Sequence, residues 1–335
     1  METDDLSRSF TFVAVVNTSI GQLDSEDQFL ARHKARSAVG CAQKCLTNKQ
    51  CQVIGFNAKS GVCWLMKSVG RNGVLKSQDN VILMKVGFEK TTEEKDVEEF
   101  SSCKEVWDKG RSKGNGFYNM KTNQTSSTLT YCHMDKLPNC GGGGWTLTMK
   151  IDGSLNTFNY KSPYWTNRQA LKTENGLGLE DNESKLPTYW STPLTKICLG
   201  MKMQTSSEIK WLKLELKQRA ASLYDVITTG YPKEPYTLLR FSKWKDTFIP
   251  SPGIYIRNPK EGVSVTRCDG SGRSLGVRLG VIYNDQYNNP IYLGFGTWGS
   301  WHQRHKIDVS CGHGKQSADY PYYKKSPAFC YILVQ

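Results

Sequence analysis

The first stretch with a clear hydrophobic pattern lies between residues 27 and 48. Apolar or small residues recur there at helical spacing, namely at Leu30, Ala35, Ala38, Ala42, Cys45 and Leu46. The spacing predicts a helix over Asp27 to Asn48. Cys41 and Cys45 are four residues apart, so both thiols face the same side of that helix.

Two short apolar runs follow the predicted helix. Cys51 to Asn57 and Val62 to Met66 have the pattern of strands, and the segment AKSG between them predicts a β-hairpin. A helix held on a hairpin by two bridges suggests nested disulfides, with Cys45–Cys51 inside Cys41–Cys63.

A further strand is predicted from Trp145 to Met149, which alternates as a half-buried strand does. The four glycines before it, Gly141 to Gly144, allow a tight turn with positive φ and close packing beneath Trp145. Neither a helix nor a GK[ST] motif follows them, so they do not form a phosphate loop. The last residues, FCYILVQ, predict a closing strand.

No apolar run approaches the roughly 18–20 residues of a membrane-spanning helix. The longest early run, Phe10 to Val16, lies behind an acidic start, which is the wrong charge for a signal peptide. The mean hydropathy is −0.52, yet the chain has nine Trp and sixteen Tyr. These values predict a polar but globular protein, and 335 residues suggest two domains.

The eleven cysteines divide the chain unevenly. Four lie within residues 41–63, and the other seven are Cys103, Cys132, Cys140, Cys198, Cys268, Cys311 and Cys330. Between the two groups, Glu89 to Ser102 carries six acids and two lysines, which predicts a solvated linker. The predicted organisation is a domain over 1–88, a linker over 89–102 and a domain over 103–335.

The net charge of +13 is distributed as unevenly as the cysteines. Residues 1–88 carry +4, the linker −4 and residues 103–335 +13. The C-terminal domain is therefore expected to attract sulfated or sialylated glycans or acidic matrix components, although simple solubility also explains the charge. Its lysines are scattered and form no basic helix, which argues against nucleic acid as a partner.

The cysteine spacing favours disulfides over a zinc site. The first group has the spacing C-x3-C-x5-C-x11-C, and the chain contains no C-x-x-C. Three N-x-[ST] sequons, at Asn17, Asn123 and Asn182, are candidate glycosylation sites. Together with the cysteine count they favour an oxidising context and predict a secreted, extracellular protein.

The helix, the nested cysteines and the F-N…G-V-C-W-L hairpin resemble the PAN/apple domain over about residues 10–88. This resemblance implies a small disulfide-stapled domain with a helix on an antiparallel sheet. Full apple domains add a third bridge between their ends, for which no cysteines are present here. Such domains bind proteins or carbohydrates and are not catalytic, and a spacer without a ligand is the alternative.

The remainder, about residues 103–335, resembles fibrinogen-related domains. The first matching stretch has CKEVW from Cys103, then G-F-Y, Y-C-H-M and CGGGGWT from Cys140. The second includes KLPTYWSTPLTKICLGMK, GVRLGVIYND, YLGFGTWGSW and FCYILVQ, and resembles an invertebrate secreted subgroup that echoes the intelectins. The resemblance implies a larger, mixed, loop-rich domain, which makes the chain α+β. Members of this group are lectins, adhesion molecules and extracellular-matrix components, some of them in mineralised skeletons.

The same resemblance guides the pairing of the seven C-terminal cysteines. Cys103–Cys132 follows the family's first bridge, and Cys140–Cys198 encloses the first core segment. Of the remaining three we expect Cys268–Cys311, because Cys330 lies in a closing strand where family members do not usually need a bridge. Cys330 would then be a buried free thiol, and an intermolecular bridge is the alternative.

Fibrinogen-related domains usually hold Ca²⁺ in an acidic loop before the ligand pocket. The equivalent segment here is Tyr283 to Pro290, which offers one carboxylate, Asp285, and amide oxygens such as that of Asn288. Ca²⁺ takes six to eight oxygen ligands, so this is a weak calcium candidate. A plain Asn/Asp turn is the alternative.

The densest aromatic and polar cluster follows that loop. Its candidate ligand-binding residues are Trp298, Trp301, His302, His305 and Tyr320. Aromatic faces suit the apolar side of a sugar, and imidazoles supply directed hydrogen bonds. A surface loop whose tryptophans pack on the core is the plainer reading, and a zinc site is a third.

Enzyme motifs are missing from the sequence. His302-x-x-His305 lacks the Glu of H-E-x-x-H, and no G-x-S-x-G occurs. We therefore expect a non-enzymatic protein of recognition or adhesion, whose fibrinogen-like domain binds glycans or anionic groups as lectins do. No cofactor other than calcium is expected, and an oligomer is compatible with the sequence. The alternative is a structural protein of an extracellular, mineral-associated matrix.

Overall fold

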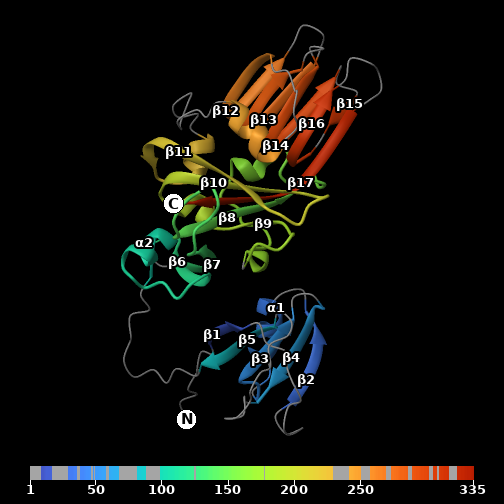
Figure 1. Cartoon of the computed structure of the whole chain (residues 1–335). Helices are drawn as coiled ribbons and strands as arrows, with labels where there is room; N and C mark the ends of the chain where they lie inside the picture. Colours follow the sequence, from blue (N-terminus) through green and yellow to red (C-terminus); the bar gives the residue numbers. More distant parts are fainter. Residues whose placement is uncertain are drawn as a thin grey trace. The chain divides into compact units, whose positions relative to one another are not determined.

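The structure is a computed structural model of the chain. It describes residues 9–16, 29–35, 38–46, 48, 50–57, 60–67, 81–87, 99–123, 126–176, 178–228, 241–249, 257–268, 273–285, 289–301, 305–307, 309–316 and 323–335. The chain divides into two compact units, Met1–Val97 and Glu98–Gln335 (Figure 1). This division falls within the predicted linker, of which residues 89–98 lie outside the described part.

In its described residues, the first unit is an antiparallel sheet with one helix, α1 (Ala38–Leu46). Its strands are β1 (Ser9–Val16), β2 (Phe29–Lys34), β3 (Val53–Asn57), β4 (Val62–Met66) and β5 (Val81–Gly87), in the order β1-β5-β3-β4-β2. Disulfides Cys41–Cys63 and Cys45–Cys51 tie α1 to β4 and to the start of the hairpin. Their four sulfurs are buried with Ile54, Phe56 and Leu65, so the nested bridges form the centre of this small core.

The predicted helix over residues 27–48 is wrong in its first half. Residues 29–34 form strand β2, which pairs with β4 along the sheet edge, and the helix begins only at Ala38. Leu30 and Ala31 still pack on the core, but they reach it from a strand. Pairing with β4 satisfies the main-chain groups along one edge of this segment, and local spacing gives no sign of such a long-range partner.

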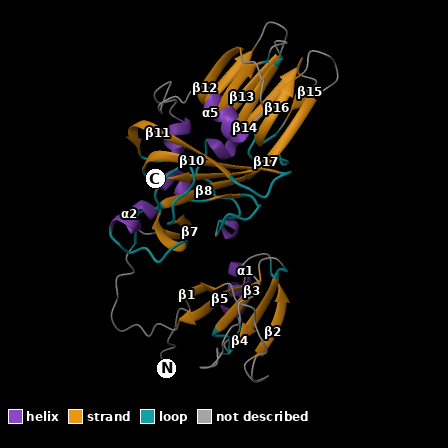
Figure 2. Cartoon of the chain, viewed as in Figure 1, coloured by secondary structure: helices purple, strands orange, loops and turns teal. Residues whose placement is uncertain are grey.

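The second unit consists mostly of strands, with short helices (Figure 2). The helices are α2 (Cys103–Asp108), η2 (Pro163–Trp165), η3 (Thr173–Asn175), α3 (Thr188–Ser191), α4 (Leu223–Thr228) and α5 (Phe241–Phe248). The first six strands are β6 (Gly116–Lys121), β7 (Ser127–His133), β8 (Trp145–Asp152), β9 (Ser184–Lys185), β10 (Leu194–Met203) and β11 (Lys210–Ala220). The others are β12 (Arg257–Cys268), β13 (Arg273–Asn284), β14 (Pro290–Trp301), β15 (His305–Ile307), β16 (Cys311–Gln316) and β17 (Tyr323–Val334).

Strand β17 joins two groups of antiparallel strands. Its first half pairs with β16, which continues the row β12-β13-β14-β16, and its second half lies between β10 and β8. The largest core contains residues of both groups, such as Ile332 on β17 and Phe295 on β14, together with Trp165 and Trp244. Strands outweigh helices in the described residues, so the chain is more β than the α+β class that the sequence suggested.

Strand β8 is buried more completely than its alternation predicted. Every residue from Trp145 to Ile151 is buried, including Lys150. One edge of β8 pairs with β17 and the other with β7 and β9, while α2 and α3 pack against it. Alternation of polar and apolar residues therefore does not mark a solvent-facing side here, because threonines and a lysine are buried by other elements.

Three disulfides lie in the second unit. Cys103–Cys132 and Cys140–Cys198 form the pairs suggested from the sequence. The third prediction was wrong: Cys311 pairs with Cys330, and Cys268 is exposed with a free thiol. Cys311 and Cys330 lie on the adjacent strands β16 and β17, whereas β12, which ends in Cys268, is three strands from β16. At about 4.8 Å per strand, that is roughly 14 Å, beyond the reach of a disulfide.

A row of glycines crosses four strands of the β12–β16 group. Gly262, Gly280, Gly294 and Gly312 face one another in register. Each has a positive φ, between 133° and 156°. A β-carbon on Gly280 would lie 2.3 Å from the carbonyl oxygen of Leu293, and one on Gly294 would meet Leu279 in the same way. The backbones of neighbouring strands therefore approach each other where no side chain fits.

The end of the predicted linker belongs to the second unit. Phe100 is buried, and its main chain forms a bridge to one edge of β6, donating to the Asn119 carbonyl and accepting from the Lys121 N–H. Ser102 caps α2 by accepting a hydrogen bond from the Glu105 N–H. Residues 99–102 are therefore part of the folded unit rather than of a solvated spacer.

Candidate functional site

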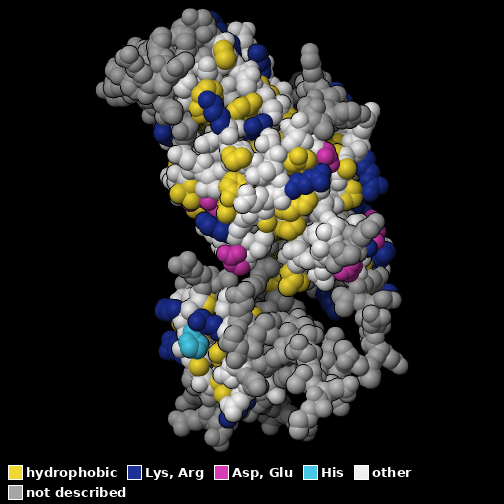
Figure 3. Space-filling view, turned by 180° about the vertical axis from the view of Figure 1, so that it is seen from behind, with side chains coloured by type: hydrophobic (Ala, Val, Ile, Leu, Met, Phe, Trp, Pro, Cys, Tyr) yellow, Lys and Arg dark blue, Asp and Glu magenta, His cyan; other side chains and the backbone are white. Residues whose placement is uncertain are grey.

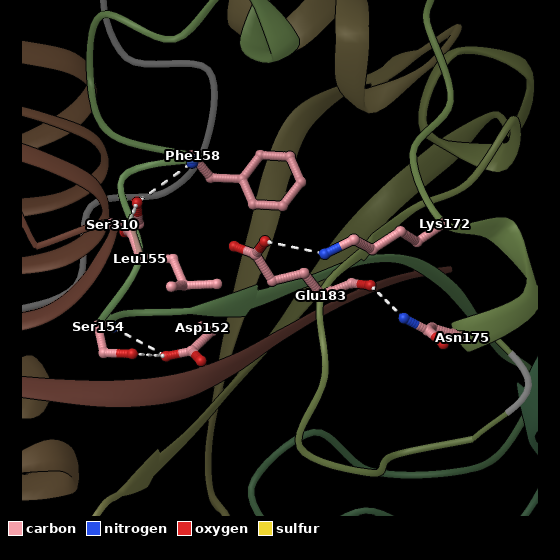
Figure 4. Close-up of polar contacts among 8 residues, drawn as sticks. All are labelled: Asp152, Ser154, Leu155, Phe158, Lys172, Asn175, Glu183 and Ser310. Atoms are coloured by element: carbon pink, nitrogen blue, oxygen red, sulfur yellow. Dashed lines mark hydrogen bonds and ion pairs between the residues drawn. The ribbon is translucent and has the colours of Figure 1, made fainter. Parts of the chain in front are cut away.

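The loop between β8 and η2, residues 153–162, lies over strands β13 and β14. Asp152 starts it by accepting hydrogen bonds from the amide and hydroxyl of Ser154, at 2.8 and 2.6 Å (Figure 4). Farther on, Ser310 donates from its hydroxyl to the carbonyl oxygen of Leu155 at 2.5 Å and accepts from the N–H of Phe158 at 3.1 Å. These contacts fix the loop to the segment that precedes β16.

Two further glycines make room for an aromatic ring of this loop and for one of η2. A β-carbon on Gly276 would lie 2.9 Å from Cγ of Tyr160, and one on Gly296 would lie 2.7 Å from the ring of Trp165. The N–H of Tyr160 donates to the carbonyl oxygen of Thr297 at 3.2 Å. Trp165 is fully buried and donates its indole N–H to Phe158 and Asn159. The rings therefore rest directly on the backbone of β13 and β14.

Two cations accompany the aromatic rings on this side of the sheet. The Arg278 guanidinium lies 4.3 Å from the ring centroid of Tyr160, and the Lys161 ammonium lies 4.0 Å from that of Trp298. Arg278 also donates from Nε to the Tyr160 carbonyl at 2.8 Å and from Nη1 to Ser264 Oγ at 3.0 Å. We call Tyr160, Lys161, Arg278 and Trp298 the cationic face.

The positions of these four residues follow from strand register. Trp298 pairs with Gly276 across β13 and β14, and Arg278 follows Gly276 by two residues, on the same side of the strand. Burial lowers the pKa of Arg278 from its ordinary value. The guanidinium stays charged at neutral pH, because the pKa of an arginine side chain is ordinarily far above neutrality.

The residues predicted to bind a ligand are only partly described. Trp298 is half-buried on β14 and lies under the Lys161 ammonium. The main chains of Trp301 and His305 pair across β14 and β15, but their side chains lie outside the described part. His302 and Tyr320 also lie outside it. The structure thus places one of the five in the cationic face, and the others stay predictions.

Asp285, the predicted calcium ligand, is engaged by neighbouring side chains. Its carboxylate accepts hydrogen bonds from the amide N–H and side chain of Asn289, at 2.8 and 3.2 Å, and lies 2.8 Å from the Lys315 ammonium. Burial alone would raise the pKa of Asp285, but the Lys315 and Asn289 contacts outweigh it and lower the pKa. Asn288 lies outside the described residues. The contacts close the β13–β14 connection as an Asn/Asp turn does.

The metal and glycosylation candidates elsewhere in the chain also lie only partly within the described residues. Within the described ranges, no group of three or more His, Cys, Asp or Glu residues is arranged to hold a metal ion. Of the sequons, Asn123 is exposed after β6, while Asn182 is half-buried with its side-chain oxygen enclosed. Asn17 lies outside the described part. Asn123 is therefore the more accessible of the two described sequon asparagines.

Glu183 is buried beside the loop that forms the cationic face. Its side chain is 2% exposed and points toward Phe158 (Figure 4). Neither carboxylate oxygen accepts a hydrogen bond of ordinary geometry, and its ion-pair partner, the Lys172 ammonium, is 3.9 Å away. Burial raises the pKa of Glu183, and Asp152 adds to the rise, whereas Thr157 and Lys172 act against it.

Glu183→Gln is expected to flatten the pH dependence of stability above pH 4.5. An unfolded Glu183 loses its proton near its ordinary pKa of 4.5, while the folded protein keeps the proton to a higher pH. Stability contributed by this group is therefore present below pH 4.5 and is lost as pH rises through the folded pKa. Urea denaturation between pH 4 and 7 measures this slope.

The matched control for this prediction is Glu174→Gln, at an exposed position in η3. It removes the same charge without changing a buried group, so its stability profile should follow that of the unchanged protein. Parallel profiles for Glu183→Gln and the unchanged protein would contradict the prediction.

Most of the cationic face was missed from the sequence. Tyr160, Lys161 and Arg278 were not among the candidate residues. A signal was present in β13, where GVRLGVI places one arginine in an otherwise apolar and glycine-rich run. Such a cation in a strand pattern marks a position at which solvent or an anion is accessible.

Comparison with known protein families identifies the first unit. Residues 11–86 match the PAN domain. PAN domains are known in adhesion and protein–protein interaction modules. The family match and the five disulfides indicate an extracellular protein.

The comparison leaves the second unit without a family. No curated protein matches the chain. None of the helices in the described part is long and apolar enough to cross a membrane.

Proposed function

We propose that the chain is a secreted, non-enzymatic recognition protein, in which a PAN domain is joined to a fibrinogen-related domain with lectin-like binding of glycans or anionic groups. The observation that carries the proposal is the PAN match over residues 11–86, in a fold built around nested disulfides. PAN domains occur in interaction modules, which supports a role in recognition. The charge of +13 over residues 103–335 supports a preference for acidic ligands.

The fibrinogen-related assignment is supported by sequence motifs whose residues lie at structurally important points. The CGGGGWT segment leads into the buried strand β8; Cys103–Cys132 ties α2 to β7, and Cys140–Cys198 ties the start of that segment to β10. The KLPTYW segment leads from β9 into α3, where Tyr189 is buried and donates its hydroxyl to the Trp165 carbonyl at 2.9 Å. These segments support the core on which the cationic face rests.

A glycan array with the whole chain tests the proposed function. We expect binding to acidic glycans and no binding to neutral ones at physiological salt. An arm with EDTA decides the calcium question: binding that survives EDTA and Asp285→Ala is independent of calcium. Loss in both would assign calcium a role at the β13–β14 connection.

The opposite result favours a different class of function. If the folded chain binds no glycan and resists extraction from detergent-washed or decalcified matrix, the recognition proposal fails. A structural role in an extracellular matrix, possible for this kind of domain, then explains the charge and the disulfides better.

A further inference from the structure

We propose that the cationic face binds the sulfate or carboxylate groups of an acidic polysaccharide, with Arg278 and Lys161 as the residues that contact the anion. This inference rests on the proposed function and names the site and the ligand class for it. The first step is the chemistry of Arg278. Its guanidinium carries five N–H donors in a planar fork that matches carboxylate and sulfate oxygens.

Arg278 has donors left for a ligand. Its Nε and Nη1 atoms donate to the Tyr160 carbonyl and to Ser264 Oγ, both of which are neutral acceptors. In the part of the chain that the structure describes, no carboxylate forms an ion pair with it. A half-buried cation without an anion has lost hydration that no opposite charge restores, so binding an external anion is favourable there.

Lys161 places a second positive charge on the same surface. It follows Tyr160 directly in the chain, is exposed, and lies over the half-buried ring of Trp298. Trp298 pairs in register with Gly276, on which the Tyr160 ring rests. The two cations therefore belong to one surface and can meet neighbouring anionic groups of a polymer.

The cationic face is preorganised by contacts within the protein. The loop is fixed to the sheet by Ser310, by the Tyr160–Thr297 main-chain hydrogen bond and by the buried Trp165 ring. Arg278 is held by two hydrogen bonds and by the Tyr160 ring. A preorganised site of this kind loses little conformational entropy when it binds.

The surrounding charge favours an acidic polymer over a neutral one. Residues 257–335 contain ten Lys and Arg against five Asp and Glu. Of those acids, Glu261 accepts the Trp244 indole N–H and Asp285 pairs with Lys315; the other three lie outside the described part. On the face seen in Figure 3, the described Lys and Arg side chains are scattered rather than gathered in a band. Charge alone therefore does not locate the site, and the local geometry at Arg278 does.

The test measures binding of the whole chain to heparin, to hyaluronan and to neutral dextran by calorimetry at physiological salt. Heparin carries sulfates and carboxylates, and hyaluronan carries carboxylates alone. We expect heparin to bind and dextran not to bind. Binding of hyaluronan as well assigns the site to carboxylates, and its absence assigns it to sulfates.

Matched variants separate the site from general attraction. Arg278→Gln and Lys161→Gln are each expected to weaken heparin binding at least tenfold. Arg219→Gln and Lys136→Gln remove the same charge from exposed positions outside the cationic face and should change it less than twofold. Lys161 is exposed, so Lys161→Gln leaves the fold intact even if Arg278→Gln does not, and thermal unfolding checks both.

The outcomes distinguish this inference from the proposed function. Equal weakening by site and control variants overturns the cationic face while recognition of acidic glycans stands. Failure of the unchanged protein to bind heparin, hyaluronan and every array glycan overturns both. Arg278-dependent binding of double-stranded DNA as tight as that of heparin overturns the polysaccharide as the ligand.

Discussion

Replacing Gly280 with alanine is expected to destabilise the second unit by about 3 kcal/mol. Gly280 has a φ of 156°, which residues with a β-carbon rarely adopt. Its new β-carbon would lie 2.3 Å from the Leu293 carbonyl oxygen and 2.8 Å from Cα of Gly294. Both obstacles are backbone atoms of the neighbouring strand, so no side chain can rotate away to relieve the clash.

Thermal unfolding measures this effect as a decrease in Tm of about 6–12 °C for a unit of this size. Gly116→Ala in β6 is the control, because no heavy atom lies within 4 Å of its β-carbon position. Its Tm should change by no more than about 2 °C. If the two variants unfold at the same temperature, the close approach of β13 and β14 at Gly280 is disproved.

The sequence was most informative where structure depends on neighbours in the chain. The hairpin over residues 51–66 was predicted correctly as two paired strands, because alternation and a short polar connection specify it locally. Cys41 and Cys45, one helical turn apart, did lead to the nested bridges. Both features need only a few residues of context.

Features that depend on distant strands were not predictable in this way. The glycines of the cross-strand row are separated by 14 to 18 residues, and nothing local shows that they meet in register. Residues 29–34 have apolar positions that fit a helix equally well, and only the edge of β4 makes them a strand. Tertiary structure decides which strand such a segment pairs with, and local sequence propensity carries no information about that partner.

The residues of the cationic face likewise were predictable only where the signal was local in the sequence. Trp298 was a candidate because aromatic and polar residues cluster around it in the sequence. Arg278 and Tyr160 lie 118 residues apart, and their contact exists only because the loop after β8 crosses β13. A glycine-rich strand such as β13 gives a hint, since Gly276 leaves space for a ring from elsewhere, but it does not say which ring.

Removing the Cys311–Cys330 bridge is the second change with a large expected effect. The double variant Cys311→Ala/Cys330→Ala should lose about 3 kcal/mol of stability, as expected for a bridge that closes a loop of this length. The two cysteines are 19 residues apart and both are buried, so the bridge ties the start of β16 to the middle of β17. Strand β17 joins both groups of strands, and loosening it should lower Tm by about 6–12 °C.

Cys268→Ala is the matched control and decides between the two possible pairings. With a free, exposed thiol at the end of β12, its loss should change stability by less than about 0.5 kcal/mol. In the native, unreduced protein, alkylation followed by peptide mass spectrometry should label Cys268 and leave Cys311 and Cys330 linked. The alternative pair, Cys268–Cys311, makes the opposite prediction: Cys268→Ala would destabilise as strongly as Cys311→Ala, and the alkylated residue would be Cys330. The distance across three strands argues against that pair, because β12 and β16 would have to abandon their places on either side of β13 and β14.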